Sequence, residues 1–141
     1  TFEDLMAFVH DMPDEEYRLI IGTDSQVSED TCFVSAIVIH RVGRGARYYY
    51  SREHETIGTG LRQRIFYEAS KSLDLASQIA HKLAENGHAD VNIEIHLDVG
   101  VNGKTKELIR DIVGMITGTG FAARIKPDSY GASKVADKHT R

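Results

Sequence analysis

The sequence predicts an α/β protein built on a mixed five-stranded sheet that is flanked by helices. The chain has 141 residues, which is the length of one domain. In its first half, three apolar segments follow one another across short turns, which favours an antiparallel meander. In its second half, two further apolar segments alternate with helical patterns, which favours parallel crossover connections.

An additional helix precedes the first predicted strand. Apolar residues recur at helical spacing through residues 1–12, and Pro13 ends the pattern. We therefore expect a single domain over residues 1–141 in which residues 1–12 form an extra N-terminal helix.

The antiparallel part of the sheet is predicted from the three short apolar segments. Residues 25–31 are polar and predict a turn between the first two segments, and Gly43 and Gly45 suit a hairpin between the second and third. We expect these strands over residues 19–23, 32–42 and 47–53.

The alternating part of the fold begins with a long helix over residues 61–85. Its apolar positions recur at steps of three and four, and Asn86 and Gly87 end it. Residues 91–99 then alternate strictly between apolar and polar side chains, as in a strand. The remaining predicted elements are a helix over 105–117, a strand over 121–125 and a short helix from about Ala132.

Composition and charge exclude several classes of protein. With 41% hydrophobic and 27% charged residues, the chain is neither disordered nor collagen-like. A formal net charge of −4 argues weakly against a protein that coats nucleic acid electrostatically. The longest apolar run, residues 33–39, is too short to span a bilayer. Cys32 is the single cysteine and no signal-peptide pattern is visible, so we expect a cytoplasmic protein.

Two aspartates stand at the ends of predicted strands. Asp24 directly follows an apolar segment, and Asp98 directly follows Leu97. If the two strands are parallel neighbours, both carboxylates emerge at the same edge of the sheet, where α/β sheets bind ligands. Either residue alone is typical of a turn or a cap, whereas the pair favours a functional site.

A glutamate interrupts the apolar stripe of the long helix. Glu68 lies between Ile65 and Ser72 along this stripe. Since a buried carboxylate is costly without compensation, its position indicates a cation, a basic partner or bound water nearby. Two structural alternatives remain open: Glu68 lies at the margin of the stripe, or it pairs with Arg64 four residues earlier.

Two later aspartates compete as a fourth acid. Asp137 lies on the predicted last helix, and Asp128 lies shortly before it, where a helix cap is the ordinary role. Carboxylates that converge on one edge suit Mg²⁺ or Mn²⁺, because hard divalent cations take oxygen ligands. Two such ions about 4 Å apart can serve phosphodiester cleavage.

The strand order and the order of these acids resemble the ribonuclease H fold. Asp24, Glu68 and Asp98 match the first three acids of that family's metal site, and the Ala-Asp step at Asp137 resembles its fourth. Three segments resemble the bacterial YkuK family more closely, a resemblance that covers nearly the whole chain. These segments are Ile20–Gln26, Leu97–Gly100 and Lys126–Ala132.

The resemblance implies a ribonuclease H-like fold and a nuclease that acts on RNA or DNA with two Mg²⁺ or Mn²⁺ ions. It implies catalytic and metal-binding roles for Asp24, Glu68, Asp98 and Asp137. Substrate contacts are expected from Ser25, Gln26, Lys104, Asp128 and Lys134. The alternative is a non-catalytic module that binds nucleic acid or protein and retains the fold.

The segment over residues 98–105 ends in Gly-Lys-Thr, like a phosphate-binding P-loop. However, Asp98 occupies the place of the first glycine, and its carboxylate repels phosphates. The glycines of this segment could instead let the backbone approach a nucleic-acid phosphate beside Lys104.

Basic and aromatic residues gather around the predicted hairpin. Arg41, Arg44 and Arg47 adjoin three tyrosines at positions 48–50, which suits either a nucleic-acid strand or a solvated hairpin tip.

Histidine and cysteine do not indicate a zinc site, because the seven histidines show no close ligand spacing. His96 shares a strand face with Asp98, so it could orient an acid or take up a proton, but a hydrogen-bonded histidine in the sheet is the favoured interpretation. Cys32 is most simply a small core residue.

Overall fold

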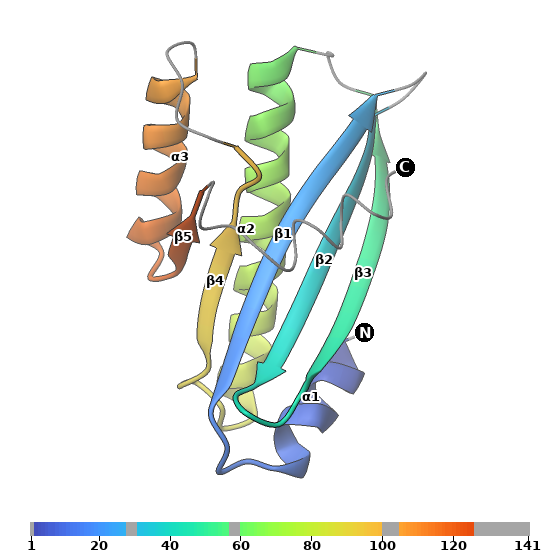
Figure 1. The fold of residues 1–141 in the computed structure, drawn as a ribbon, viewed down its shortest axis with the longest axis vertical. Helices are drawn as coiled ribbons and strands as arrows, with labels where there is room; N and C mark the ends of the chain where they lie inside the picture. The colour runs from blue at the N-terminus through green and yellow to red at the C-terminus, as the bar shows by residue number, and fades with distance from the viewer. Residues whose placement is uncertain (1, 28–30, 57–59, 100–104, 126–141) are drawn as a thin grey trace.

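The computed structural model describes residues 2–27, 31–56, 60–99 and 105–125, which form three helices and five strands (Figure 1). The strands make one sheet in the order β3-β2-β1-β4-β5. β2 pairs antiparallel with β1 and β3, whereas β4 pairs parallel with β1 and β5, so the predicted mixed α/β architecture is confirmed. The elements are α1 (Phe2–Asp11), β1 (Tyr17–Val27), β2 (Thr31–Arg41), β3 (Ala46–Glu55), α2 (Leu61–Glu85), β4 (Asn92–His96), α3 (Lys106–Gly118) and β5 (Ala122–Arg124).

The three helices pack on one face of the sheet, and α2 passes behind β1 in the view of Figure 1. Side chains alternate along a strand, so β1 directs Leu19 and Ile21 to this face. There they pack with buried residues from each helix, among them Leu5, Ile79 and Ile116. This packing against one face fixes where α2 lies over the sheet.

The long helix has the predicted bounds. α2 begins at Leu61 and ends at Glu85. Asn86 closes its last turn by donating its backbone N–H to Lys82, and Gly87 follows with a φ of 80°. Glycine adopts this left-handed conformation without the steric cost of a side chain, so it suits the residue after a helix.

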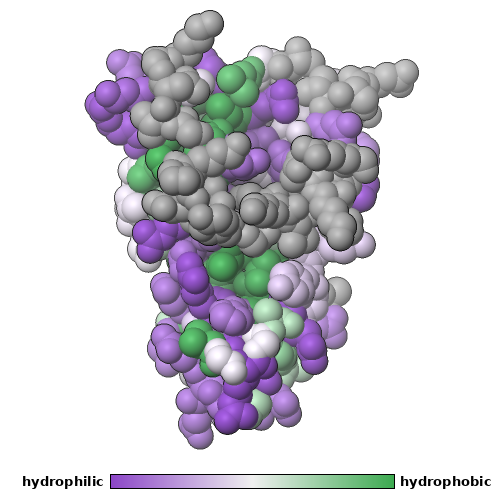
Figure 2. Space-filling model, in the orientation of Figure 1, coloured by the Kyte–Doolittle hydropathy of each residue, from purple (hydrophilic) through white to green (hydrophobic). Residues whose placement is uncertain are grey.

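The opposite face of the sheet carries a second, smaller apolar cluster. Ile20, Val34, Ala36 and Val38 are buried together there, with the half-buried Cys32 packed against them. Apolar residues come to the surface near the middle of the face seen in Figure 2, between hydrophilic ones. The strand β2 is therefore apolar on both faces, with Ile37 and Ile39 towards the helices and Val34, Ala36 and Val38 on the other side.

Several predicted strand boundaries are wrong, and the largest differences are at the ends of β1 and β4. β1 continues to Val27, so its end lies inside the predicted polar turn at 25–31. Ser25 and Gln26 keep pairing with Phe33 and Cys32, because the ladder with β2 outweighs the turn preference of the polar side chains. Conversely, β4 ends at His96, before the end of its alternating pattern.

The predicted last helix from about Ala132 lies outside the described residues. Within the described ranges, none of the helices combines the length and apolarity needed to cross a lipid bilayer.

Candidate functional site

The candidate site lies where β4 ends beside the middle of β1. Gly22 of β1 is paired with His96 of β4, and Asp24 and Asp98 each follow two residues further on. Neighbouring strands are about 4.8 Å apart, and residues two positions apart share a face. Both aspartates are half-buried, and the backbone N–H of Ser25 donates to Asp24 Oδ1 over 2.9 Å.

Glu68 reaches the same end of the sheet from α2. It lies three residues after Ile65 and four residues before Ser72, which are both buried, so it is on the side of α2 that faces the sheet. The Ser25 hydroxyl donates to Glu68 Oε2. This contact joins the third carboxylate to the strand that carries Asp24.

Arg64 completes this network by binding Ser25. Its Nε lies 3.2 Å from Ser25 Oγ, and its Nη2 lies 3.4 Å from the Ser25 carbonyl oxygen. Arg64 and Glu68 are therefore connected by hydrogen bonds to the same Ser25 hydroxyl.

The pKa of Glu68 reflects this environment. Its pKa is raised from 4.5 to about 7, mainly because the side chain is buried, and the negative charges of Asp24 and Asp98 contribute to this increase. The Ser25 hydrogen bond and the positive charge of Arg64 oppose the increase. Asp24 and Asp98 thus lie close enough to Glu68 to act on it electrostatically.

A group of buried hydroxyls lies beside Ser25, between β1, β2 and α2. Thr23 Oγ1 is 2.8 Å from Ser35 Oγ and 2.7 Å from Ser72 Oγ, so it joins β1, β2 and α2. Sequence reasoning did not identify this group. A signal was present, because Thr23 and Ser25 alternate along one strand face and Ser72 lies on the inward stripe of the helix.

The donor chemistry of the site fits a hard divalent cation. Asp24, Glu68 and Asp98 offer only oxygen ligands, which Mg²⁺ and Mn²⁺ prefer. Among the described residues, however, no three acidic, histidine or cysteine side chains are close enough together to hold one ion. The candidate fourth acids, Asp137 and Asp128, lie outside the described residues.

Of the predicted substrate contacts, the structure describes Ser25 and Gln26, which both lie on β1. Gln26 is exposed near the end of β1, whereas Ser25 is buried against Glu68. Lys104 and Lys134 lie outside the described residues, as do most of residues 98–105.

The arginines near the hairpin do not form a common basic surface. Arg41 is buried, with Nη2 2.8 Å from the Phe8 carbonyl oxygen and its guanidinium 4.0 Å from the Phe8 ring centre. Arg44 pairs with Glu15 over 3.0 Å. The hairpin also lies at the end of β1 remote from Asp24, about 20 Å away by strand rise. The interpretation as a hairpin tip is therefore favoured over a nucleic-acid surface at these arginines.

A buried ion cluster lies on the same sheet face as Asp98. Glu94 accepts hydrogen bonds from Arg18, with Nη2 at 2.8 Å, and lies 3.3 Å from His96 Nε2 and 3.4 Å from Arg124 Nε. The hydrogen bond from Arg18 is the main cause that lowers the pKa of Glu94 to about 2. His96 is thus hydrogen-bonded within the sheet, as the favoured interpretation of the sequence predicted.

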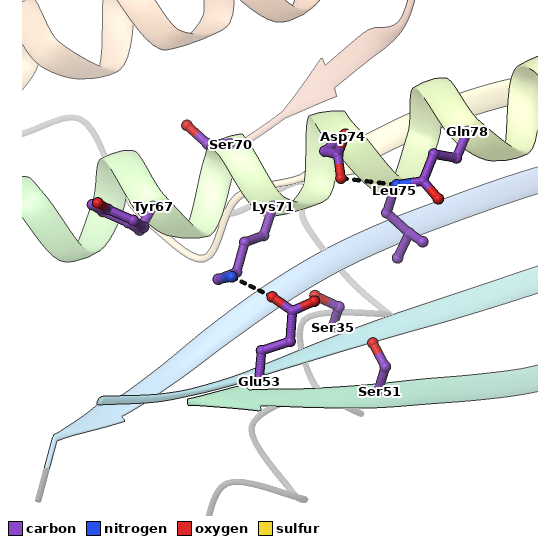
Figure 3. Close-up of a pocket in the computed structure, with 9 residues that line it drawn as sticks. All are labelled: Ser35, Ser51, Glu53, Tyr67, Ser70, Lys71, Asp74, Leu75 and Gln78. Carbon is purple, nitrogen blue, oxygen red and sulfur yellow. Dashed lines mark hydrogen bonds and ion pairs between the residues drawn. The ribbon is translucent and has the colours of Figure 1, made fainter. Parts of the chain in front are cut away.

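A polar cleft of about 330 Å³ lies beside the candidate site, between α2 and the strands β2 and β3 (Figure 3). Lys71 of α2 points across it to Glu53 of β3 and also binds Glu55 over 3.0 Å. Ser35 and Ser51 line its strand side, and Asp74 lies on α2.

The chain is similar to a protein family, to a bacterial relative and to a solved viral structure. A family described as Ribonuclease H-like matches residues 1–141. The chain is 38% identical to the Uncharacterized protein YkuK of Bacillus subtilis (strain 168), in a 164-residue alignment that covers 100% of this chain and 91% of the relative. The crystal structure of native prototype foamy virus protease-reverse transcriptase is similar with a TM-score of 0.43 and 12% identity, over 90% of this chain. The chain spans 21% of that viral protein's length.

Proposed function

The chain belongs to the ribonuclease H-like family, and from this premise we propose that it is a divalent-metal-dependent nuclease acting on RNA or DNA. The observation that carries the proposal is the grouping of Asp24, Glu68 and Asp98 at one end of the sheet. Three mutually repelling carboxylates are costly to hold together, and a divalent cation offsets that cost. We place the protein in the cytoplasm, since its single cysteine suits a reducing compartment.

We assign the binding of two Mg²⁺ or Mn²⁺ ions to Asp24, Glu68, Asp98 and Asp137. When bound, such ions activate the attacking water and neutralise the charge that develops on the phosphodiester. Gln26, Lys104, Asp128 and Lys134 are proposed to contact the substrate around this edge, together with Ser25.

Residues of the chain prepare this site before a cation binds. Arg64 holds Ser25, and Ser25 holds Glu68 within the fold, while the raised pKa keeps much of Glu68 protonated near neutral pH. Protonation relieves part of the repulsion from Asp24 and Asp98. Binding of a cation is therefore expected to release a proton from Glu68.

The test is a nuclease screen over RNA, DNA, hybrid and branched substrates with Mg²⁺ and with Mn²⁺. Cleavage by the wild type and its loss in Asp24→Asn are expected, with Glu15→Gln as a matched surface variant that retains activity. Cleavage that persists at the same rate in Asp24→Asn would come from a contaminating enzyme and would count against the proposal.

A non-catalytic module that binds nucleic acid or protein is the second candidate. The observation that favours it is that no three acidic, histidine or cysteine side chains of the described residues are placed to hold a metal ion. In addition, Glu68 already accepts a hydrogen bond from Ser25. Isothermal titration with Mn²⁺ separates the two candidates. Binding that Asp24→Asn abolishes supports the nuclease, and absence of binding to the wild type supports the module.

A further inference from the structure

The edge strand β3 is long, regular and exposed. It spans ten residues, Ala46–Glu55, without proline or glycine, and none of its side chains is buried. β2 pairs along one side of it, and no strand of the described residues pairs along the other. Such an edge presents a row of backbone donors and acceptors to any strand that can pair with it.

The sequence of β3 is complementary to itself when two copies of the strand run antiparallel with Ser51 at the centre. Four positions before it stands Arg47 and four positions after it Glu55, while Tyr50 and Arg52 flank it directly. We propose that β3 pairs antiparallel with β3 of a second copy of this chain, with the two-fold axis through Ser51. This interface is independent of the proposed nuclease activity.

The pairing on the helix face of the sheet carries the charge complementarity. In this register, Arg47 lies opposite Glu55 of the second copy, and by symmetry the pair occurs twice. Tyr49 lies opposite Glu53 of the second copy. Opposite charges across an antiparallel pair stabilise it, whereas like charges destabilise it.

The outer face is complementary in the same register. Tyr50 lies opposite Arg52 of the second copy, where a guanidinium can pack on the ring. Tyr48 lies opposite His54 of the second copy. Tyr48 and Tyr50 are 60% and 54% exposed, so cross-strand packing would bury aromatic surface.

Alternative two-fold axes further along the strand are unfavourable. An axis through Arg52 sets two arginines opposite each other, and an axis through Glu53 sets two glutamates opposite each other. Repulsion between like charges therefore disfavours these registers.

The polar cleft of Figure 3 adds a second reason for this partner. Glu53, Glu55 and Asp74 carry three negative charges beside the single positive charge of Lys71. The glutamates retain side-chain exposures of 58% and 40%. The proposed register brings Arg47 of the second copy to this acidic border, where it offsets the excess of negative charge.

Disulfide trapping tests the register in the full chain, in a Cys32→Ala background. Directly opposed residues in antiparallel strands have Cα atoms about 4.5–5.5 Å apart, which a disulfide can bridge. Ser51→Cys is expected to give a covalent dimer on mild oxidation. Tyr48→Cys, whose copies lie about 20 Å apart in this register, is expected to stay monomeric.

Charge reversal tests the interface without oxidation, by sedimentation across a concentration series. Arg47→Glu and Glu55→Arg are each expected to raise the dimer dissociation constant at least about tenfold. The double variant, which restores opposite charges, is expected to return it close to the wild-type value.

A wild type that is monomeric up to the highest soluble concentration would overturn the proposal. So would equal cross-linking of Ser51→Cys and Tyr48→Cys, or a double variant that is weaker than both single ones. If the wild type stays monomeric and Tyr48→Ala weakens binding of a single-stranded oligonucleotide, the strand serves nucleic acid instead.

Discussion

At the scale of single residues, Glu68 shows how tertiary structure changes the chemistry of a side chain. A glutamate on a helix has an ordinary pKa near 4.5, but here burial and two neighbouring aspartates raise it to about 7. The sequence predicted that Glu68 faces inward, and it left open whether Arg64 pairs with it directly. The structure places Ser25 between them, a contact that no sequence spacing indicates because 43 positions separate Ser25 and Glu68.

The raised pKa of Glu68 predicts a pH dependence of stability in the metal-free protein. Its pKa is higher in the folded chain than in the unfolded one, so the protonated form stabilises the fold and this contribution is lost as pH rises from about 4.5 through 7. Relative to Glu68→Gln, the wild type is expected to lose roughly 1–3 kcal/mol of unfolding free energy over this range. Urea unfolding of both proteins at several pH values in the presence of a chelator measures the difference. Parallel curves for the two proteins would contradict the prediction.

At the scale of elements, the amphipathic patterns predicted most of the fold. α2 has the predicted bounds, because its stripe of apolar residues packs along one face and Asn86 and Gly87 close its end. The end of β1 was missed, since Ser25 and Gln26 have turn-forming side chains but pair with β2. Propensity is a local property, and a ladder with a neighbouring strand overrides it.

The three hydrogen-bonded hydroxyls of Thr23, Ser35 and Ser72 join β1, β2 and α2, and we expect them to contribute to stability. Thr23→Val keeps the shape of the side chain but leaves the buried hydroxyls of Ser35 and Ser72 without their shared partner. We expect it to lower the unfolding free energy by about 1–3 kcal/mol, measured by urea denaturation.

The triple variant in which Ser35→Ala and Ser72→Ala accompany Thr23→Val is the matched control. It removes the unsatisfied groups, so we expect it to recover most of the lost stability. A triple variant that is less stable than Thr23→Val by a further equal amount would show that the hydroxyls act separately.

At the scale of the whole molecule, the negative net charge is explained by the four acids of the proposed metal site. The formal charge of −4 argued weakly against binding of nucleic acid. Without Asp24, Glu68, Asp98 and Asp137, the chain carries 17 acidic and 17 basic residues. On the proposed function, the excess negative charge belongs to one site that divalent cations neutralise.

This distribution of charge predicts that binding to nucleic acid depends on divalent cations. Without them, affinity for a single-stranded oligonucleotide is expected to be weak, because a chain with a formal net charge of −4 gains little from electrostatic attraction to phosphates. Ca²⁺, which commonly binds without supporting cleavage, is expected to raise the affinity at least about tenfold by bridging carboxylates and phosphates. Fluorescence anisotropy with and without Ca²⁺ checks this, and an equal increase in Asp24→Asn would contradict it.

The sequence by itself determined the fold class, the mixed five-stranded sheet, and the positions of three acids on or directly after predicted strands and the long helix. These follow from local periodicity and from the residue types at element ends, which a linear sequence displays directly. Only the tertiary structure decided that Ser25 and Arg64 hold Glu68, that Arg41 is buried beneath α1, and that β3 lies at an edge of the sheet. Each of these depends on the register and packing of segments distant in the chain, and no local pattern encodes the distance between two such side chains.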